Sequence, residues 1–252
     1  MAQVPAATRA LRVLRFLASQ PEPVPVDRIA HDLAIPRSTA YHLLQAMADE
    51  GFVVHLADER RFGLGVAAFE VGSGYARQAP LQRIARRPLA TLVDRSGHSA
   101  HLAVPHGRDV LYVVEERAPG RPPLVTDVGV RLPSHLTASG RAILAHLPPN
   151  QVRALYPDRT SFVDRTGLGP SSPTALRTVL AETRRRGYAI EDGEVTPGMA
   201  SVAAAVLDHN GLPVAGVAVT YPVEDGPAAD RDRLATAVVD TAAALTRRLH
   251  GR

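Results

Sequence analysis

The sequence of 252 residues contains no cysteine, no tryptophan and no lysine. Without cysteine, disulfide bridges, cysteine-ligated zinc, iron–sulfur clusters and thiol nucleophiles are excluded. Aromatic residues make up only 4% of the chain, so a hydrophobic core has to consist mainly of Ala, Val and Leu. No run of about 18 apolar residues is present, and the first thirty residues lack the apolar core of a secretory signal. We therefore expect a cytoplasmic protein with no membrane partner.

The charge of the chain is nearly balanced. All 29 basic residues are arginines, and the formal net charge is +4. Hydrophobic residues at 45% and charged residues at 21% are typical of a folded protein rather than a disordered one. Residues 1–66 contain equal numbers of arginines and acids. Net charge alone therefore does not indicate a nucleic-acid-binding protein, and the positions of particular residues have to decide that question.

The N-terminal quarter of the sequence has the pattern of a winged helix-turn-helix domain, which we place at residues 1–65. Apolar residues at helical spacing predict three helices, and two short apolar segments around a polar turn predict a β-hairpin. The predicted ranges are 7–19, 27–33 and 36–49 for the helices and 52–64 for the hairpin. Three helices followed by a hairpin are typical of this DNA-binding fold.

The rest of the chain is predicted to form a linker helix and a second domain. The linker, residues 66–80, contains a helix from Val66 to Arg77 that we expect to mediate dimerisation through Val66, Phe69 and Tyr75. Residues 81–252 alternate between strands and helices, so the whole chain is of the α+β class. Strands are predicted at 99–104, 109–116, 187–191, 199–207 and 213–221. Helices are predicted at 81–96, 137–146, 150–156, 173–186 and 228–249.

The strongest local motif lies in residues 26–44. Ala30 and Ala34 are small enough to let two helices cross closely, and Ile35 is apolar in the turn between them. The outward face of the third helix combines hydroxyl, basic and amide side chains, which hold phosphates or read base edges in the major groove. The predicted DNA-binding residues of this face are Arg37, Ser38, Thr39, Tyr41, His42 and Gln45. We expect Arg60 and Arg61 near the tip of the hairpin, where the wing would contact the DNA backbone or minor groove.

Several segments resemble the IclR family of bacterial transcription regulators. Residues 9–77 resemble the family's DNA-binding domain, and the stretch Ile35 to Leu44 is very close to its recognition helix, with His42 where the family often has Arg. Leu136 to Ala145 resembles its T-A-x-G-[KR]-A helix start. Residues 187–194 and 198–206 resemble its effector domain. These segments follow the family's order and span nearly the whole chain.

The resemblance implies a GAF-like C-terminal domain, with a mixed or antiparallel sheet, that binds a small carboxylate-bearing effector. A helix N-terminus offers N–H donors and positive potential to an anion. The implied effector-binding residues are Ser139, Gly140, Glu191, Met199, Ser201 and Thr220. Glu191 replaces the family's Asp and Ser201 its frequent Cys, so the effector's identity does not carry over. Because one recognition helix reads only a few bases, we expect a homodimer or dimer of dimers on a partly palindromic double-stranded operator. The resemblance implies a repressor more often than an activator.

Other readings of the sequence are weaker. His98, His101 and His106 do not have metal-ligand spacing, because odd separations along a strand place side chains on opposite faces. We expect neither a metal nor a cofactor. The alternative function is a small-molecule-processing enzyme with the winged helix as a fused dimerisation arm. No nucleophile–base or metal constellation supports it, and we predict no catalytic residues.

Overall fold

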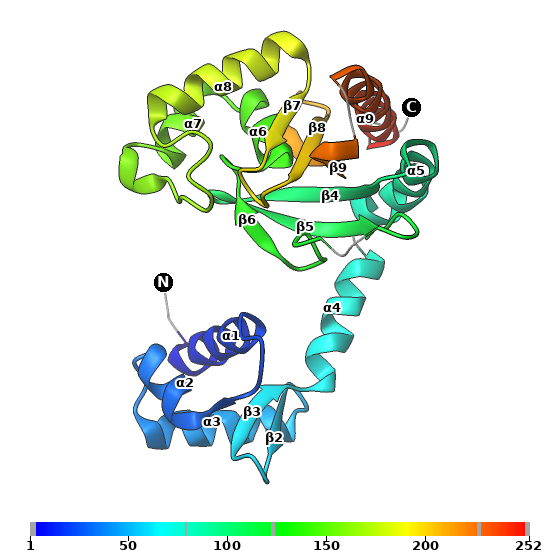
Figure 1. Cartoon of the computed structure of the whole chain (residues 1–252). Helices are drawn as coiled ribbons and strands as arrows, with labels where there is room; N and C mark the ends of the chain where they lie inside the picture. The colour runs from blue at the N-terminus through cyan, green and yellow to red at the C-terminus, as the bar shows by residue number, and fades with distance from the viewer. Residues whose placement is uncertain (1–3, 79, 122–123, 226–227, 250–252) are drawn as a thin grey trace. The chain divides into compact units, whose positions relative to one another are not determined.

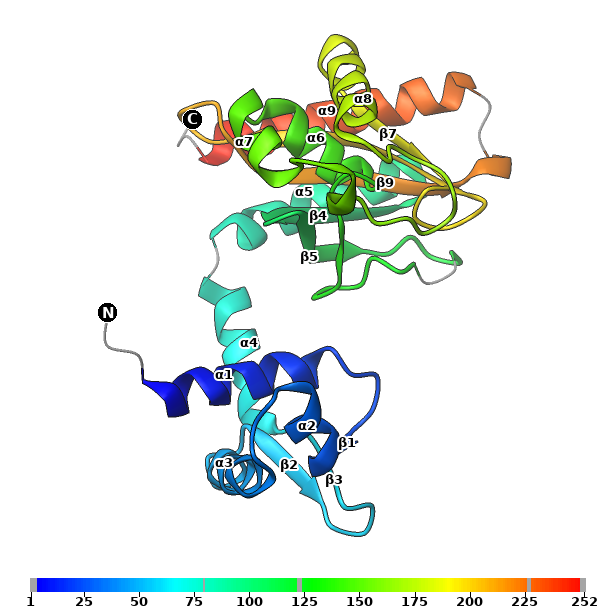
Figure 2. The same ribbon diagram turned by 90° about the vertical axis from the view of Figure 1, so that its left-hand side faces the viewer.

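The computed structural model describes residues 4–78, 80–121, 124–225 and 228–249, and the chain divides into two compact units, Met1–Ala79 and Pro80–Arg252 (Figures 1 and 2). Each unit has its own hydrophobic core. No helix of the described residues has the length and hydropathy to cross a membrane.

The N-terminal unit is a winged helix-turn-helix, as predicted. Its elements are α1 (Pro5–Ala18), β1 (Val24–Pro25), α2 (Val26–Asp32), α3 (Arg37–Asp49), β2 (Val53–Leu56), β3 (Arg61–Leu64) and α4 (Val66–Gln78). The strands form an antiparallel sheet in the order β1-β3-β2. Val13, Ile29, Ala40 and Leu44 have no exposed surface and fix the three helices against one another. Strand β1 was not predicted, because two residues carry no alternation pattern and only pairing with β3 defines them.

The turn between α2 and α3 differs from the prediction for Ala34. Its φ is +53°, in the left-handed region that glycine adopts most readily, and its side chain is exposed. Ala34 therefore does not lie in the contact between the two crossing helices. Ala30 and Ala40, both buried, provide the close approach. The small side chain at position 34 is favoured by the backbone conformation of the turn.

Helix α4 exposes apolar side chains. Val66 and Phe69, one turn apart, are 72% and 76% exposed, and Val71 is 61% exposed. The side chain of Tyr75 lies outside the described part of the structure. Val66 and Phe69 form the apolar face of the described part.

The C-terminal unit is built on a six-stranded sheet in the order β6-β5-β4-β9-β8-β7, with every neighbouring pair antiparallel. Helices α5 and α9 cover one face, and α6 covers the other, with α7 and α8 outside it (Figure 1). The strands are β4 (Ser99–His106), β5 (Asp109–Glu116), β6 (Arg131–Pro133), β7 (Ala189–Asp192), β8 (Met199–Leu207) and β9 (Pro213–Pro222). The helices are α5 (Pro80–Ser96), α6 (Ala138–His146), α7 (Pro149–Leu155), α8 (Pro173–Arg186) and α9 (Ala228–Leu249), with short 3₁₀ turns at Arg159–Ser161 and Val223–Asp225.

The two faces of this sheet differ in side-chain size. The face under α5 and α9 carries mainly Val and Ala, and leucines of the two helices pack against it. The face under α6 carries Ala189, Ala203 and Ala218, which pack against Ala138 and Ala142 of the helix. Because these side chains are small, α6 lies close to the sheet, and a Cβ added at Gly216 would come within 2.8 Å of the Ser139 carbonyl oxygen. This close packing places the N-terminus of α6 directly against the sheet.

Candidate functional sites

The outward face of α3 presents the polar side chains that the sequence predicts. Arg37, Ser38, Tyr41, His42 and Gln45 are exposed, and Thr39 is half-buried. Ala40, Leu44 and Met47 form the opposite, buried face. The separation of the two faces leaves the polar face free for a partner.

Arg37 is held in place by one ion pair. Its Nε lies 2.8 Å from Asp27 Oδ1 of α2, and the two side chains are 72% and 63% exposed. An exposed pair of this kind contributes about 0–1 kcal/mol. Asp27 therefore positions the guanidinium without preventing its transfer to a phosphate or base edge.

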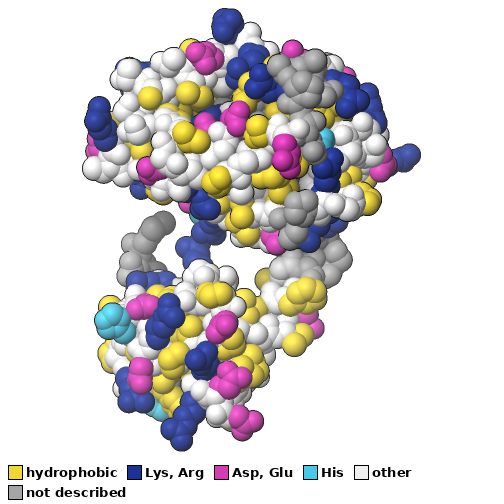
Figure 3. Space-filling view, viewed as in Figure 1, with side chains coloured by type: hydrophobic (Ala, Val, Ile, Leu, Met, Phe, Trp, Pro, Cys, Tyr) yellow, Lys and Arg dark blue, Asp and Glu magenta, His cyan; other side chains and the backbone are white. Residues whose placement is uncertain are grey.

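The structure places Arg60 in the turn of the wing and Arg61 next to it, at the first position of β3. Arg60 is exposed in the turn between β2 and β3. Arg61 belongs to β3 and donates to the Pro23 carbonyl at 3.3 Å, with Glu22 Oε2 at 3.7 Å. Both arginines therefore lie near the tip as expected, and the contacts with Pro23 and Glu22 hold the half-exposed side chain of Arg61 toward the segment before β1. Figure 3 shows arginine and acidic side chains interspersed over the visible face of this unit rather than one basic patch.

A second candidate site lies in the C-terminal unit, where strand register aligns polar residues. Glu191 on β7 pairs with Ser201 on β8, which pairs with Thr220 on β9. Paired residues share one face of a sheet. The Ser201 and Thr220 hydroxyl oxygens lie 2.9 Å apart. The three predicted effector-binding residues therefore form one polar row.

The N-terminus of α6 faces this row. Thr137 caps the helix, accepting a hydrogen bond from the Gly140 N–H at 3.1 Å. The Ser139 hydroxyl is buried and forms no well-aligned hydrogen bond among the described residues, although it lies beside the Tyr112 hydroxyl. A buried hydroxyl in this state is costly unless a ligand or water completes its hydrogen bonding. Ser139 is therefore the group most ready to receive a ligand.

Gly140 has a different role from the predicted one. Its N–H is already bound to Thr137, and it does not line the cavity. A Cβ at this position would lie 2.3 Å from the Cα and carbonyl oxygen of Ser134. Glycine is required here by the close approach of the backbone, and the prediction of an effector contact is corrected on that ground.

The cavity between these elements is small. Its volume is about 30 Å³, enough for about two water molecules. Met199 and the polar row line it, as do residues that the sequence did not single out: Tyr112, Leu124, Val125, Thr126, Thr137, Ala138, Val195, Thr196 and Ala218. An organic ligand enters only if the surrounding segments move apart, so binding has to be coupled to a conformational change.

Burial makes the carboxyl of Glu191 unusual. The residue is 2% exposed, and burial raises its pKa from 4.5 to about 7, although a hydrogen bond from the Val195 N–H opposes the shift. At neutral pH a large share of Glu191 is therefore protonated and able to donate a hydrogen bond. This removes much of the repulsion that a carboxylate ligand would meet.

His101 lies next to the cavity wall, on β4. It has no exposed surface, and burial lowers its pKa to about 4. Its Nδ1 lies 3.3 Å from the hydroxyl of Thr126, and its ring contacts Tyr112 edge-on at 5.9 Å between centroids. The neutral imidazole positions two residues that line the cavity. In the described part of the chain no group of three or more His, Asp or Glu is arranged to hold a metal ion.

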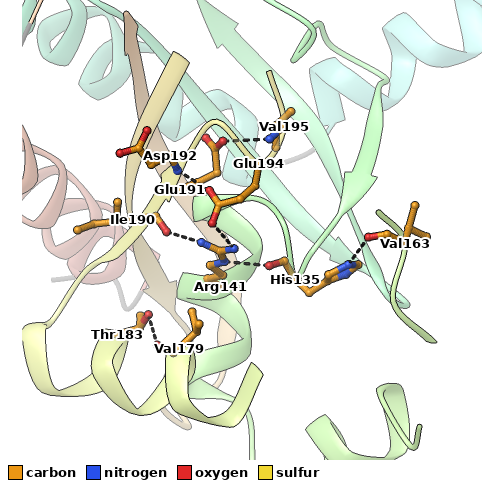
Figure 4. A network of polar contacts seen from close by, with 10 residues as sticks. All are labelled: His135, Arg141, Val163, Val179, Thr183, Ile190, Glu191, Asp192, Glu194 and Val195. Atoms are coloured by element: carbon orange, nitrogen blue, oxygen red, sulfur yellow. Dashed lines mark hydrogen bonds and ion pairs between the residues drawn. The ribbon is translucent and has the colours of Figure 1, made fainter. Parts of the chain in front are cut away.

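Arg141 ties α6 to the segment that carries Glu191 (Figure 4). Its guanidinium donates at 2.8 Å to the carbonyls of His135 and Ile190 and to the carboxylate of Glu194. The side chain is only 4% exposed, so these contacts compensate its buried charge. The network fixes β7 relative to the N-terminal half of α6 and so fixes the two sides of the cavity relative to each other.

These two sites define a class of protein, a winged helix-turn-helix DNA-binding unit joined to a small-molecule-binding α+β unit. The model of the IclR helix-turn-helix domain matches residues 6–57, and that of the bacterial transcriptional regulator IclR C-terminal domain matches residues 73–247. The chain belongs to the IclR family of DNA-binding transcriptional regulators. Proteins of this family bind DNA and small-molecule effectors.

Individual relatives cover almost the whole chain. A glycerol operon regulatory protein of Streptomyces coelicolor is 35% identical over 245 residues, 96% of this chain and 94% of that protein. The transcriptional repressor IclR of Escherichia coli is 30% identical over 223 residues, 88% and 81% of the two chains. The crystal structure of Thermotoga maritima IclR aligns with a TM-score of 0.74 at 26% identity, covering 98% of this chain and 99% of that one. These relatives are named as regulators and not as enzymes.

A further solved structure, an IclR homologue from Microbacterium hydrocarbonoxydans in complex with 4-hydroxybenzoate, has a TM-score of 0.81 at 22% identity. The alignment covers 98% of this chain and all of that one. At this identity the likeness supports the fold.

Proposed function

We propose that the protein is a repressor that binds a partly palindromic operator and is controlled by a small organic acid. The observation that carries the effector assignment is the buried hydroxyl of Ser139, without a well-aligned hydrogen bond among the described residues, at the N-terminus of α6, opposite the polar row of Glu191, Ser201 and Thr220. Two relatives are named repressors, in Escherichia coli and Salmonella typhimurium, which supports the direction of regulation.

The proposed DNA interface is the outward face of α3 together with Arg60. Arg37, Ser38 and Thr39 lie in the first turn of α3, where hydroxyl and guanidinium groups hold phosphates or reach base edges. Tyr41, His42 and Gln45 continue the same face toward the major groove. One such helix reads only a few base pairs, so we propose a homodimer, or a dimer of dimers, that places two or more copies on a symmetric site.

The proposed effector is a carboxylate of small volume. Its anionic group would accept hydrogen bonds from the Ser139 hydroxyl and from the protonated form of Glu191, while Ser201 and Thr220 offer further hydroxyls. Met199 gives the cavity an apolar wall. The 4-hydroxybenzoate complex of the Microbacterium relative supports an organic acid as the class of ligand.

The test uses the full chain, a DNA fragment from the promoter of its own gene, and a panel of small aliphatic and aromatic carboxylates. Operator affinity is measured by fluorescence anisotropy with and without each acid. An effective acid should change it about 5- to 150-fold, the usual range of allosteric coupling. Ser201→Leu, which fills the cavity, should keep operator affinity and lose the response. If no acid alters DNA binding, or if the variant responds fully, the effector site is assigned wrongly.

A further inference from the structure

A larger cavity lies elsewhere in the C-terminal unit, between α7 and α8. Its volume is about 510 Å³, against about 30 Å³ for the cavity at α6, and the two share no lining residue. Ligand-binding pockets in proteins commonly measure about 300–1,000 Å³. The cavity between α7 and α8 is therefore open to an organic molecule without movement of its walls.

The floor of this cavity is apolar. Val152 and Tyr156 of the α7 side and Leu176 and Leu180 of α8 are buried and belong to one small core with Leu144 of α6. The Tyr156 hydroxyl is turned away to donate to the Arg108 carbonyl at 3.0 Å. The apolar side chains are spaced three or four residues apart, so each helix presents one continuous stripe to the cavity.

The rim of the cavity is cationic. Arg153, Arg177 and Arg184 line it, and no Asp or Glu does. Within the described residues none of the three guanidinium groups has a carboxylate at ion-pair distance.

Hydrogen bonding leaves these guanidinium groups with spare donors. Arg177 donates to the Thr174 hydroxyl at 3.0 Å and Arg184 to the Ala145 carbonyl at 3.1 Å. A guanidinium has five N–H donors, so most remain available. Glu182, the one acid in the sequence of α8, lies about 140° around the helix from Arg177 and faces away from the cavity. The rim therefore has a positive charge that the protein does not neutralise.

We propose that the cavity between α7 and α8 is a second ligand site, which takes an organic acid with an extended apolar body, such as a medium-chain aliphatic monocarboxylate. The body lies against the half-buried Leu147 and Pro173 and the exposed Ala181, which line the cavity above its buried floor, and the carboxylate binds Arg177 or Arg153 at the rim. An apolar floor beneath unpaired guanidinium groups matches the two ends of such a molecule. The site is additional to the proposed effector pocket.

Its position connects it to that pocket. Arg184 bonds the carbonyl of Ala145 near the C-terminal end of α6, and the opposite end of the same helix carries Ser139. Because Arg184 lines the same cavity, a ligand between α7 and α8 lies beside the guanidinium that holds the C-terminal end of α6.

The test is calorimetric titration of the full chain with octanoate. The double variant Arg153→Gln, Arg177→Gln should weaken octanoate binding at least tenfold. Arg185→Gln is the matched control, because it removes one charge from the same helix without lining the cavity, and it should change affinity less than twofold. Ala181→Trp, which fills the cavity from an exposed position, should abolish binding. Ser201→Leu in the effector pocket should leave it unchanged.

Four outcomes would overturn the proposal. Octanoate binding that survives both the double variant and Ala181→Trp places the ligand elsewhere. A loss in Ser201→Leu assigns it to the effector pocket. Equal affinity for 1-octanol removes the role of the arginines. The fourth outcome is that the unmodified protein binds no octanoate while Ala181→Trp changes the assembly size in sedimentation. That result would make the cavity an interface between copies of the chain.

Discussion

Single residues decide how the stability of the cavity at α6 depends on pH, and Glu191 is the clearest case. Its pKa in the folded chain is raised from 4.5 to about 7 by burial, so the folded state holds this proton more tightly than the unfolded state. The resulting stabilisation is complete below about pH 4.5 and is lost as pH rises through 7. Glu191→Gln, which is neutral throughout, should match the unmodified protein near pH 5 and exceed its free energy of unfolding near pH 8 by on the order of 1–3 kcal/mol. Urea unfolding at both pH values measures this.

Comparison with the variant is needed because His101 titrates in the opposite sense. Burial lowers its pKa from 6.5 to about 4, so its contribution to stability is present above 6.5 and lost as the pH falls toward 4. Both proteins contain His101, and its effect cancels in the difference. A difference between the two proteins that stays constant from pH 5 to pH 8 would show that Glu191 is ionised throughout this range.

The sequence predicts the role of such a residue best when that role depends only on neighbours in the same helix or strand. The polar face of α3 follows from one helix and its periodicity. The contacts of Arg61 with Pro23 and Glu22 were not predicted, because these partners lie almost forty residues earlier. Gly140 was taken for a ligand contact because its clash with Ser134 exists only in the folded structure. The cavity residues Leu124 to Thr126 belong to an irregular segment, where no periodic pattern identifies them.

At the scale of elements, the turn between α2 and α3 stores strain that substitution should release. Ala34 adopts a φ of +53°, which costs a residue with a Cβ about 1–2 kcal/mol relative to glycine. Replacing Ala34 by glycine removes this cost, but the greater chain entropy of glycine in the unfolded state offsets part of the gain in stability. Ala34→Gly should therefore raise the free energy of unfolding by about 0.5–1 kcal/mol. The same exchange in a regular helix, Ala46→Gly in α3, should lower it by about the same amount, and equal losses in both would contradict the strain.

The close contact between α6 and the segment that precedes it leads to a second prediction for an element. Gly140→Ala should lower the free energy of unfolding by about 1–3 kcal/mol, because the added methyl overlaps the Ser134 backbone. Gly72→Ala in α4 meets no atom within 4 Å and should stabilise its helix by about 0.5–1 kcal/mol. Urea unfolding of both variants gives the comparison. If Gly140→Ala is as well tolerated as Gly72→Ala, α6 does not rest on Ser134 as described.

At the scale of the whole molecule, the exposed apolar face of α4 bears on assembly. Phe69 and Val66 are 76% and 72% exposed, and neighbouring aromatic and aliphatic side chains in this state are typical of an interaction surface. In a two-fold symmetric contact each residue occurs twice, so the loss of one aromatic side chain per chain weakens the dimer by several kcal/mol. Each 1.4 kcal/mol raises the dimer dissociation constant about tenfold. We expect Phe69→Ser to raise the dimer dissociation constant by more than tenfold in sedimentation equilibrium. Leu11→Ser, which removes another exposed apolar side chain from the same unit, should change it less than twofold.

DNA binding should follow assembly. A dimer places two α3 helices on two half-sites, so a partly palindromic operator is bound with the sum of both contacts, and a monomer retains only one. Phe69→Ser should therefore lose operator affinity at nanomolar concentrations but keep the same affinity for an isolated half-site, since α3 itself is untouched. If the variant binds the full operator as tightly as the unmodified chain, or if the unmodified chain is monomeric on DNA, α4 is a plain connection between the two units and the symmetric mode of operator binding fails with it.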